Sequence, residues 1–391
     1  MVELYRRTPW WAKVLAIFVI ARALTTVMLL VLASVQGENA WTGASPGYFD
    51  YATLWDGRWY NIVAGWGYPS ELPMTDDGHV AENAWAFMPA YPGIVSALMF
   101  LTGLPWGVAA VIVSVVFGLG TALLFYKLMA KVLEPQAALF SVVLLCVAPV
   151  SPLMQLAYAE SMFLFLIALA LYLLLERRYW LLFPVLAVMA FTRPGALAFA
   201  LALALHVVYR WFTRARDPFP VRERVAAASA TVFSGIMGVA WLLIAWAVTG
   251  DFSAYTDTEL AWRSAYIGYV DLVPFTAWFQ GGNWWLHGPL GSVVVAVLIL
   301  GFAALLFTPI VKRLGVDLRF WIASYALYLL AVFFPQSSTF RLLAPLFPLL
   351  GAIALPKSAV YRVAVVIVSL ALQLGWLLIC WGVDGRDWTP P

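Results

Sequence analysis

The chain carries very little charge. Asp, Glu, Lys and Arg make up only 11% of its 391 residues, whereas a soluble globular domain carries about 25%. Hydrophobic residues account for 64% of the sequence. This composition excludes a soluble globular protein and predicts an all-α bundle that crosses a membrane several times.

Cysteine and histidine are also scarce, and this excludes several kinds of site. Cys146 and Cys380 lie in apolar runs, so we interpret them as small buried hydrophobes rather than as a disulfide or a metal site. His79, His206 and His287 are scattered without the spacing of metal ligands. The sequence also lacks a glycine-rich phosphate loop and a basic stripe typical of nucleic-acid binding. We therefore expect no metal, no other cofactor and no nucleic-acid partner.

Long apolar runs, in contrast, are abundant. The runs near the length that crosses a bilayer cover residues 12–35, 106–126, 136–153, 156–175, 179–192, 194–212, 225–248, 290–311, 319–335, 341–356 and 359–382. Because a span needs ~20 residues, they predict about 11 spans. A further run, 88–103, is short and broken by Pro89, Pro92 and Gly93.

The positions of the basic residues set the predicted orientation, because Lys and Arg accumulate in cytoplasmic loops. If residues 88–103 do not cross the membrane, most of the 23 basic residues, Arg6 and Arg7 included, face the cytoplasm. We therefore expect 88–103 to be an interfacial or re-entrant helix, with the N-terminus inside and the C-terminus outside. Most of the acidic residues then share the outer face.

Two long polar segments interrupt the apolar runs in what we predict to be a single integral membrane domain, residues 1–391. The first, 36–105, is predicted to be an outer loop that carries juxtamembrane and interfacial helices. The second, 249–289, is predicted to be another large outer loop. Long ordered loops usually carry function, and the part of the first loop over 54–92 is both acidic and rich in aromatic residues.

Motifs in the first loop and in three later segments occur in a recognisable order. They are Trp55-Asp56-x-x-Trp59-Tyr60, Ala86-Phe87-Met88-Pro89, Tyr158-Ala159-Glu160-Ser161, Thr192-Arg193, and Arg341 with the following Ala-Pro-Leu-Phe-Pro. In this order they resemble the PIG-V-type (GPI mannosyltransferase 2-like) mannosyltransferases in their bacterial form, which belong to the GT-C class of polytopic glycosyltransferases. The chain departs from the family pattern at Met88, where a second Phe is usual, and at Phe340, where bacterial members often have Tyr.

The resemblance implies a GT-C-like architecture and makes 36–105 the outer catalytic loop. It also implies that mannose, or another hexose, moves from a polyprenyl-phosphate sugar to an acceptor hydroxyl on the non-cytoplasmic face, by an inverting and metal-independent reaction. A lipid-phosphate donor has to be bound at the membrane interface, where Trp and Tyr are favoured. The expected partners are this donor, a lipid, glycan or protein acceptor, and the bilayer. Composition leads us to expect the plasma membrane of a bacterium.

Such a transfer needs a carboxylate for the acceptor proton and a cation for the phosphate leaving group. Asp56 is the predicted base, because it follows the first span and lies among aromatic residues; the alternative is a helix N-cap. Arg341 is the first choice for the phosphate, with snorkelling to lipid headgroups as the alternative. Arg193 is a comparable choice that also fits a structural corner. Arg263 is a third candidate, with a solvated or loop-pairing charge as its alternative.

The remaining predicted substrate-binding residues flank these groups. They are Trp55, Arg58, Trp59, Tyr60, Glu82, Tyr158 and Glu160. Glu82 is interpreted either as a residue that orients substrate hydroxyls or as a helix N-terminal acid. Glu160 is predicted to pair with an arginine such as Arg193.

Two other classes of membrane protein stay open at this point. A transporter would carry its coupling acids near the middle of the membrane, whereas the acids here are predicted to lie at one face. A non-catalytic protein that binds lipids or glycolipids fits the same topology. It would keep its function after an Asp56→Asn substitution, and an enzyme would not.

Overall fold

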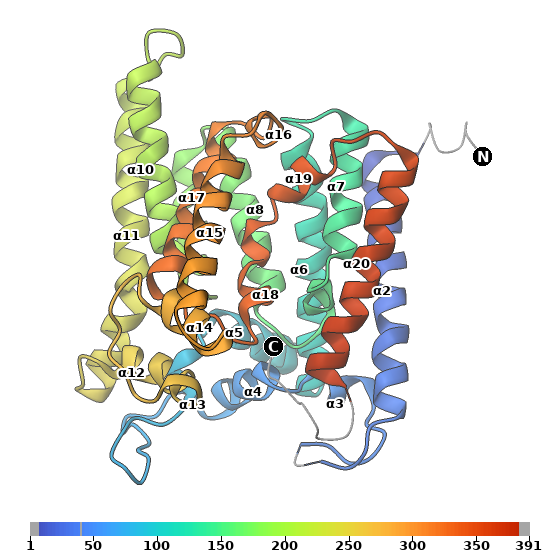
Figure 1. Ribbon diagram of the computed structural model, residues 1–391, viewed down its shortest axis with the longest axis vertical. Helices are drawn as coiled ribbons and strands as arrows, with labels where there is room; N and C mark the ends of the chain where they lie inside the picture. The colour runs from blue at the N-terminus through green and yellow to red at the C-terminus, as the bar shows by residue number, and fades with distance from the viewer. Residues whose placement is uncertain (1–7, 40, 383–391) are drawn as a thin grey trace. The chain divides into compact units, whose positions relative to one another are not determined.

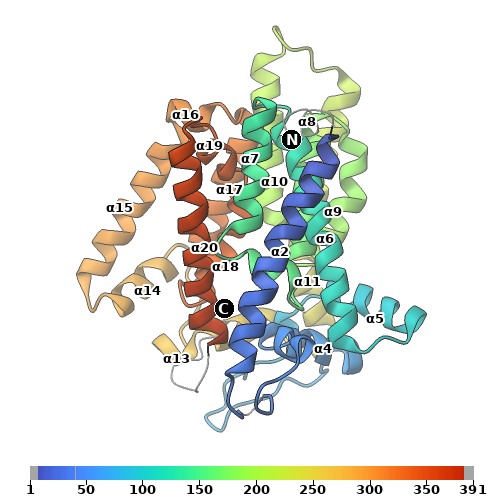
Figure 2. The same cartoon turned by 90° about the vertical axis from the view of Figure 1, so that its right-hand side faces the viewer.

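The computed structural model describes residues 8–39 and 41–382 (Figures 1 and 2), so Arg6 and Arg7 lie outside the described residues. Within these ranges the chain forms helices and no strand, and Met74 and Val80 form an isolated β-bridge. Six helices are long and apolar enough to span a membrane: α2 (Trp10–Ser34), α6 (Trp106–Met129), α10 (Ala196–Thr213), α11 (Val221–Thr249), α15 (Pro289–Leu306) and α20 (Ala359–Trp381). The predicted all-α, polytopic fold is confirmed.

Four further predicted spans form shorter helices. They are α7 (Pro135–Val147), α8 (Glu160–Leu175), α9 (Leu182–Ala190) with the 3-10 helix η3 (Tyr179–Leu181) before it, and α17 (Val316–Val332). Proline-containing corners shorten two of them: the 3-10 helix η2 (Ser151–Gln155) follows α7, and Pro194 follows α9.

The predicted run 341–356 is not one helix, and that part of the prediction is wrong. It is divided into α18 (Thr339–Leu342), the 3-10 helix η4 (Ala344–Leu346) and α19 (Leu349–Ile353). Pro345 and Pro348 lie within the run and lack the backbone N–H that a continuous helix needs. Arg341 is therefore carried by a single helical turn.

The two polar segments are largely helical. The 36–105 segment holds α3 (Tyr48–Ala52), α4 (Asp56–Trp66), the 3-10 helix η1 (Ala84–Ala86) and α5 (Ala90–Thr102), and the 249–289 segment holds α12 (Ala254–Ala261), α13 (Ser264–Ile267) and α14 (Ala277–Trp285). The short α16 (Pro309–Lys312) precedes α17. With 13 residues, α5 is too short to cross a bilayer, which agrees with the predicted interfacial or re-entrant helix.

The chain divides into two compact units. The first comprises Met1–Asn61, Gly93–Ala168 and Phe340–Pro391, and the second comprises Ile62–Pro92 and Leu169–Thr339. In the first unit α2 packs against α6, α7 and α20 (Figure 2). In the second unit α10 packs against α11 and α17, and α14 packs against α15.

A buried arginine fixes the corner after α7 in the first unit. Arg22 of α2 is 7% exposed and donates to the Cys146 carbonyl at 2.7 Å, and also to the carbonyl and hydroxyl oxygens of Ser151. Gln373 of α20 donates to the same Ser151 hydroxyl. Carbonyls that a helix end leaves unpaired cannot face lipid. Arg22 satisfies them and thereby positions η2 and the segment that leads into α8.

Replacing Arg22 by Leu is expected to lower the melting temperature of the purified protein by several degrees. The substitution leaves buried carbonyls without a donor, at a cost of about 1–3 kcal/mol for each unsatisfied group. The measurement is thermal unfolding in detergent, followed by intrinsic fluorescence. Arg362→Leu, which removes a more accessible arginine of α20, serves as the control. Equal melting temperatures for the two variants would contradict the role given to Arg22.

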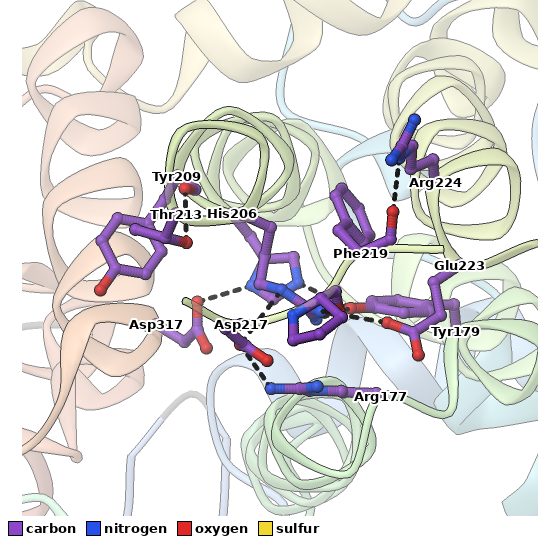
Figure 3. A network of polar contacts seen from close by, with 12 residues as sticks. Arg177, Tyr179, His206, Tyr209, Thr213, Asp217, Phe219, Glu223, Arg224 and Asp317 are labelled. Atoms are coloured by element: carbon purple, nitrogen blue, oxygen red, sulfur yellow. Dashed lines mark hydrogen bonds and ion pairs between the residues drawn. The ribbon is translucent and has the colours of Figure 1, made fainter. Parts of the chain in front are cut away.

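A polar network ties together helix ends in the second unit (Figure 3). His206 of α10 lies with Nδ1 2.7 Å from Asp317 Oδ1 and Nε2 2.9 Å from the Tyr179 hydroxyl. Arg210, one turn further along α10, donates to the same hydroxyl and pairs with Glu223. Polar side chains of membrane helices are stable when they bond to one another in this way. His206, for which we predicted no role from the sequence, therefore joins helix ends as a structural residue.

Candidate functional site

The backbone is strained immediately before α4. Trp55 has a φ of +60°, a left-handed conformation that is costly for a residue with a side chain. The indole Nε1 of Trp55 donates to the Cys380 carbonyl at 2.9 Å, which holds the residue in place. Asp56 follows as the first residue of α4. Strain of this kind is concentrated at functional sites, so this observation favours Asp56 as a functional residue.

Close packing at Gly57 sets the position of the helix start. A Cβ added to Gly57 would lie 3.2 Å from the Ala157 Cβ and 3.3 Å from the Ala157 carbonyl oxygen. The backbone N–H of Ala157 donates to the Ala52 carbonyl at 3.0 Å. The start of α4 and the segment before α8 are therefore in direct contact, and a larger residue at position 57 requires the neighbouring backbone to move by a few tenths of an ångström.

If Asp56 is the base that the sequence predicts, substituting Gly57 by Ala is expected to lower activity about tenfold to a hundredfold, because a small displacement of such a group is costly. The added methyl group pushes the start of α4, and Asp56 with it, away from Ala157. Gly65→Ala is a matched control on the same helix, since a Cβ there meets nothing within 4 Å. The comparison is of initial rates for the two variants at equal amounts of folded protein. If Gly57→Ala and Gly65→Ala had equal rates, the close packing would not matter for activity.

Asp56, Glu160 and Arg341 form one ionic cluster in the first unit. Arg341 Nη1 contacts Asp56 Oδ2 and lies 3.1 Å from Glu160 Oε1. The side chains of Asp56, Glu160 and Arg341 are 12%, 4% and 11% exposed. The two carboxylates lie at the first residues of α4 and α8, where the helix dipole favours negative charge.

Tyr158 contacts two members of this cluster, Asp56 and Arg341. Its ring is fully buried, and the Arg341 guanidinium lies 5.6 Å from the ring centroid. Its hydroxyl accepts a hydrogen bond from the backbone N–H of Asp56 at 3.3 Å. The ring of Trp381 also packs against Tyr158, with ring centroids 6.0 Å apart. Tyr158 therefore links the backbone of the predicted base to the side chain of the predicted phosphate ligand.

The other predicted residues of α4 differ in how far they are buried. Tyr60 is buried, Trp59 is half-buried and Arg58 is exposed. The Arg58 guanidinium lies 4.2 Å from the centroid of the Trp41 ring. Their proposed contacts with substrate stay predictions.

An apolar cavity of about 170 Å³ borders Glu160 in the first unit. Its polar lining comes from Ser151, Glu160 and Ser161, and its apolar lining includes Phe340 and Phe347. The cavity lies between the corner after α7, the start of α8 and the broken segment that carries Arg341. One charged residue of the cluster thus faces apolar space that is large enough for a short hydrocarbon group.

Glu160 pairs with an arginine, as the sequence predicted, and this arginine is Arg341. From the sequence we had named Arg193 as an example of such a partner. Asp56 likewise begins a helix, as its alternative interpretation required, but its carboxylate also contacts Arg341. The structure therefore brings together three predicted site residues from the start, middle and end of the chain.

The predicted residues Glu82, Arg193 and Arg263 belong to the second unit. Glu82 is exposed and precedes Asn83, the N-cap of η1. Arg263 is 4% exposed and donates to the Val270 carbonyl at 2.7 Å. Burial lowers the pKa of Arg263 from its usual value. Contacts of Glu82, Arg193 and Arg263 with substrate stay predictions.

Sequence reasoning missed a polar group on α12. Tyr255 forms a side-chain hydrogen bond with Glu259. Burial raises the pKa of Tyr255 well above its usual value, the Glu259 carboxylate raises it further, and the positive charge of Arg193 opposes this shift. The signal was present in the sequence, since Tyr255 and Glu259 are four residues apart on a helix and so lie on the same face.

Within the described ranges, no three His, Cys, Asp or Glu side chains are grouped so that they could hold a metal ion.

Comparison with solved structures identifies the architecture. ArnT from Cupriavidus metallidurans in the apo state matches with a TM-score of 0.50 and 15% identity, over 94% of this chain and 66% of that chain. ArnT bound to undecaprenyl phosphate matches with a TM-score of 0.50 and 15% identity, over 93% of this chain and 64% of that chain. The chain has a GT-C-like fold.

An oligosaccharyltransferase from Archaeoglobus fulgidus, tethered with an acceptor peptide, has a TM-score of 0.47 and 12% identity, over 95% of this chain and 56% of that chain. No protein-family model matches the sequence, and no curated protein sequence matches it. This chain spans just under two thirds of the length of the ArnT chains that it matches. The resemblance to PIG-V-type mannosyltransferases stays a prediction.

Proposed function

We propose that the chain is a membrane glycosyltransferase that moves a mannose from a polyprenyl-phosphate donor to an acceptor hydroxyl on the non-cytoplasmic face. The observation that carries this proposal is the cluster of Asp56, Glu160 and Arg341 in a GT-C-like fold. The undecaprenyl phosphate bound by ArnT supports a lipid-phosphate donor. The apolar cavity beside Glu160 supports a substrate that combines charged and hydrocarbon parts.

The proposed reaction assigns one role to each ionised group. The acceptor oxygen attacks the anomeric carbon from the face opposite the phosphate, which inverts the configuration there. Asp56 takes the acceptor proton as the new glycosidic bond forms. The bond between the anomeric carbon and the phosphate oxygen breaks, and its electron pair leaves with the polyprenyl phosphate. Arg341 stabilises the charge that develops on this leaving group.

The experiment that tests the proposal is a transfer assay with purified protein. Radiolabelled polyprenyl-phosphate mannose is incubated with a total lipid extract in detergent, with and without EDTA. Label that moves into a new lipid or glycan, equally with and without EDTA, supports a metal-independent transferase. Loss of transfer with EDTA and its recovery with magnesium or manganese would overturn metal independence. Donor binding without transfer to lipid, glycan or protein acceptors would overturn the enzymatic proposal in favour of a lipid-binding protein.

The proposed orientation has its own test, a cysteine-labelling experiment in intact cells. A cysteine that replaces Asp77, in the 36–105 segment, is expected to react with a membrane-impermeant thiol reagent. A cysteine that replaces Arg214, after α10, is expected to react only after the membrane is permeabilised. The native cysteines, Cys146 and Cys380, are both buried, so they give a low background. The reverse pattern would place the proposed site on the cytoplasmic face.

A further inference from the structure

Arg341 holds both carboxylates of the cluster with one of its three nitrogens. The contact with Asp56 and the contact with Glu160 at 3.1 Å are both made by Nη1. These contacts of the guanidinium with the two carboxylates leave Nε as a buried donor to which no described residue offers an acceptor.

The edge of the guanidinium formed by Nε and Nη2 has the geometry that recognises a phosphate. Nε and Nη2 of a guanidinium point two N–H bonds in parallel, which matches two oxygens of one phosphate group. A buried donor without a partner is costly, so the arrangement is expected to gain stability when an anion occupies the edge. The guanidinium carbon lies over the ring of Tyr158, 5.6 Å from the ring centroid, so the ring contacts a face of the guanidinium rather than accepting a hydrogen bond from its N–H groups.

We propose that Glu160 is a positioning residue that holds Arg341 by Nη1, so that the Nε–Nη2 edge receives the phosphate while the Asp56 carboxylate takes the acceptor proton. This inference rests on the proposed function. The carboxylates of Asp56 and Glu160 have different roles in the proposed reaction. Asp56 has to change its bonding partner during each turnover, and an arginine held by Asp56 alone would lose its anchor at that moment. Glu160 is 4% exposed, at the first residue of α8, and stays in place.

The test measures binding and turnover separately for Glu160→Gln. The expected result is that binding of undecaprenyl phosphate weakens about tenfold, which corresponds to ~1.4 kcal/mol. The KM for the donor should rise by a similar factor, and kcat should fall much less. Simple charge repulsion predicts the opposite sign, because removing a carboxylate near an anion site should tighten anion binding. Unchanged or tighter binding would therefore overturn the inference.

Glu134→Gln is the matched control. It removes a carboxylate from an ion pair with Lys357 in the same unit, and both side chains of that pair are more than two-thirds exposed at 71% and 75%. Its binding and turnover should equal those of the wild type. Glu160→Asp, which keeps the charge, should recover part of the lost affinity.

A second variant keeps the inference testable if Glu160→Gln affects folding. In an Arg341→Lys background the forked edge is absent, so adding Glu160→Gln should weaken undecaprenyl phosphate binding little further. Additive losses would contradict the positioning role. Because binding is measured without turnover, these outcomes are separate from the proposed function, which fails if wild-type protein binds the donor and transfers no sugar.

Discussion

Asp56→Asn is expected to lower the rate of sugar transfer by about 10²–10⁴-fold, the range that a general base contributes, while donor binding stays close to that of the wild type. Asn has nearly the shape of Asp, so the start of α4 and the hydrogen bond from its backbone to Tyr158 are preserved. The substitution removes the basic oxygen and leaves Arg341 paired with Glu160. The measurement is kcat with saturating donor, together with the Kd for undecaprenyl phosphate.

Asp50→Asn is the control for this variant. Asp50 is an exposed acid of α3 in the same unit, and its replacement should leave both quantities unchanged. Transfer by Asp56→Asn at the wild-type rate would remove Asp56 as the base. An equal loss of donor binding and of turnover would instead assign Asp56 to the donor site.

Arg341→Ala should abolish donor binding and also destabilise the protein. It leaves two largely buried carboxylates, 12% and 4% exposed, without their cation. Removing one partner of a buried ion pair costs about 3–5 kcal/mol. Arg341→Lys keeps the charge without the forked geometry, so it should fold normally and bind undecaprenyl phosphate about tenfold more weakly. The measurements are melting temperature and Kd for both variants.

Lys357→Ala provides the comparison, because its ion pair with Glu134 is exposed and surface pairs contribute only about 0–1 kcal/mol. If Arg341→Ala had the same stability and affinity as Lys357→Ala, the buried cluster would have no energetic role. If Arg341→Lys bound the lipid phosphate as tightly as the wild type, the proposed two-point contact between the Arg341 guanidinium and the phosphate would be wrong.

The sequence predicted the helices of this fold well where hydrophobicity alone determines them. Six helices, α2 among them, match long apolar runs because a span has to be apolar over its whole length. The run 341–356 is also apolar, but Pro345 and Pro348 interrupt its helix. An average of residue hydrophobicity over the run does not take account of the backbone N–H groups that proline lacks. The 249–289 segment was treated as a loop because its helices are short and polar on average.

The sequence singled out the three residues of the ionic cluster, but predicted only some of their contacts. Asp56, Glu160 and Arg341 stood out because each carries a charge at the edge of an apolar run, where charge is costly. Which arginine faces Glu160 could not be predicted, because that depends on how α8 and the segment after α17 pack. The positive φ of Trp55 could not be predicted from the sequence either, because Trp does not favour left-handed conformations.

The single turn that carries Arg341 has a consequence for the dynamics of the molecule. A four-residue helix between prolines gains little from helical cooperativity, so α18 and the residues after it depend on packing with their neighbours. Segments of this kind open locally with a smaller free energy than long core helices. Backbone amides around Arg341 should therefore exchange with deuterium sooner than those of α2, and heat should inactivate the protein before its helices melt.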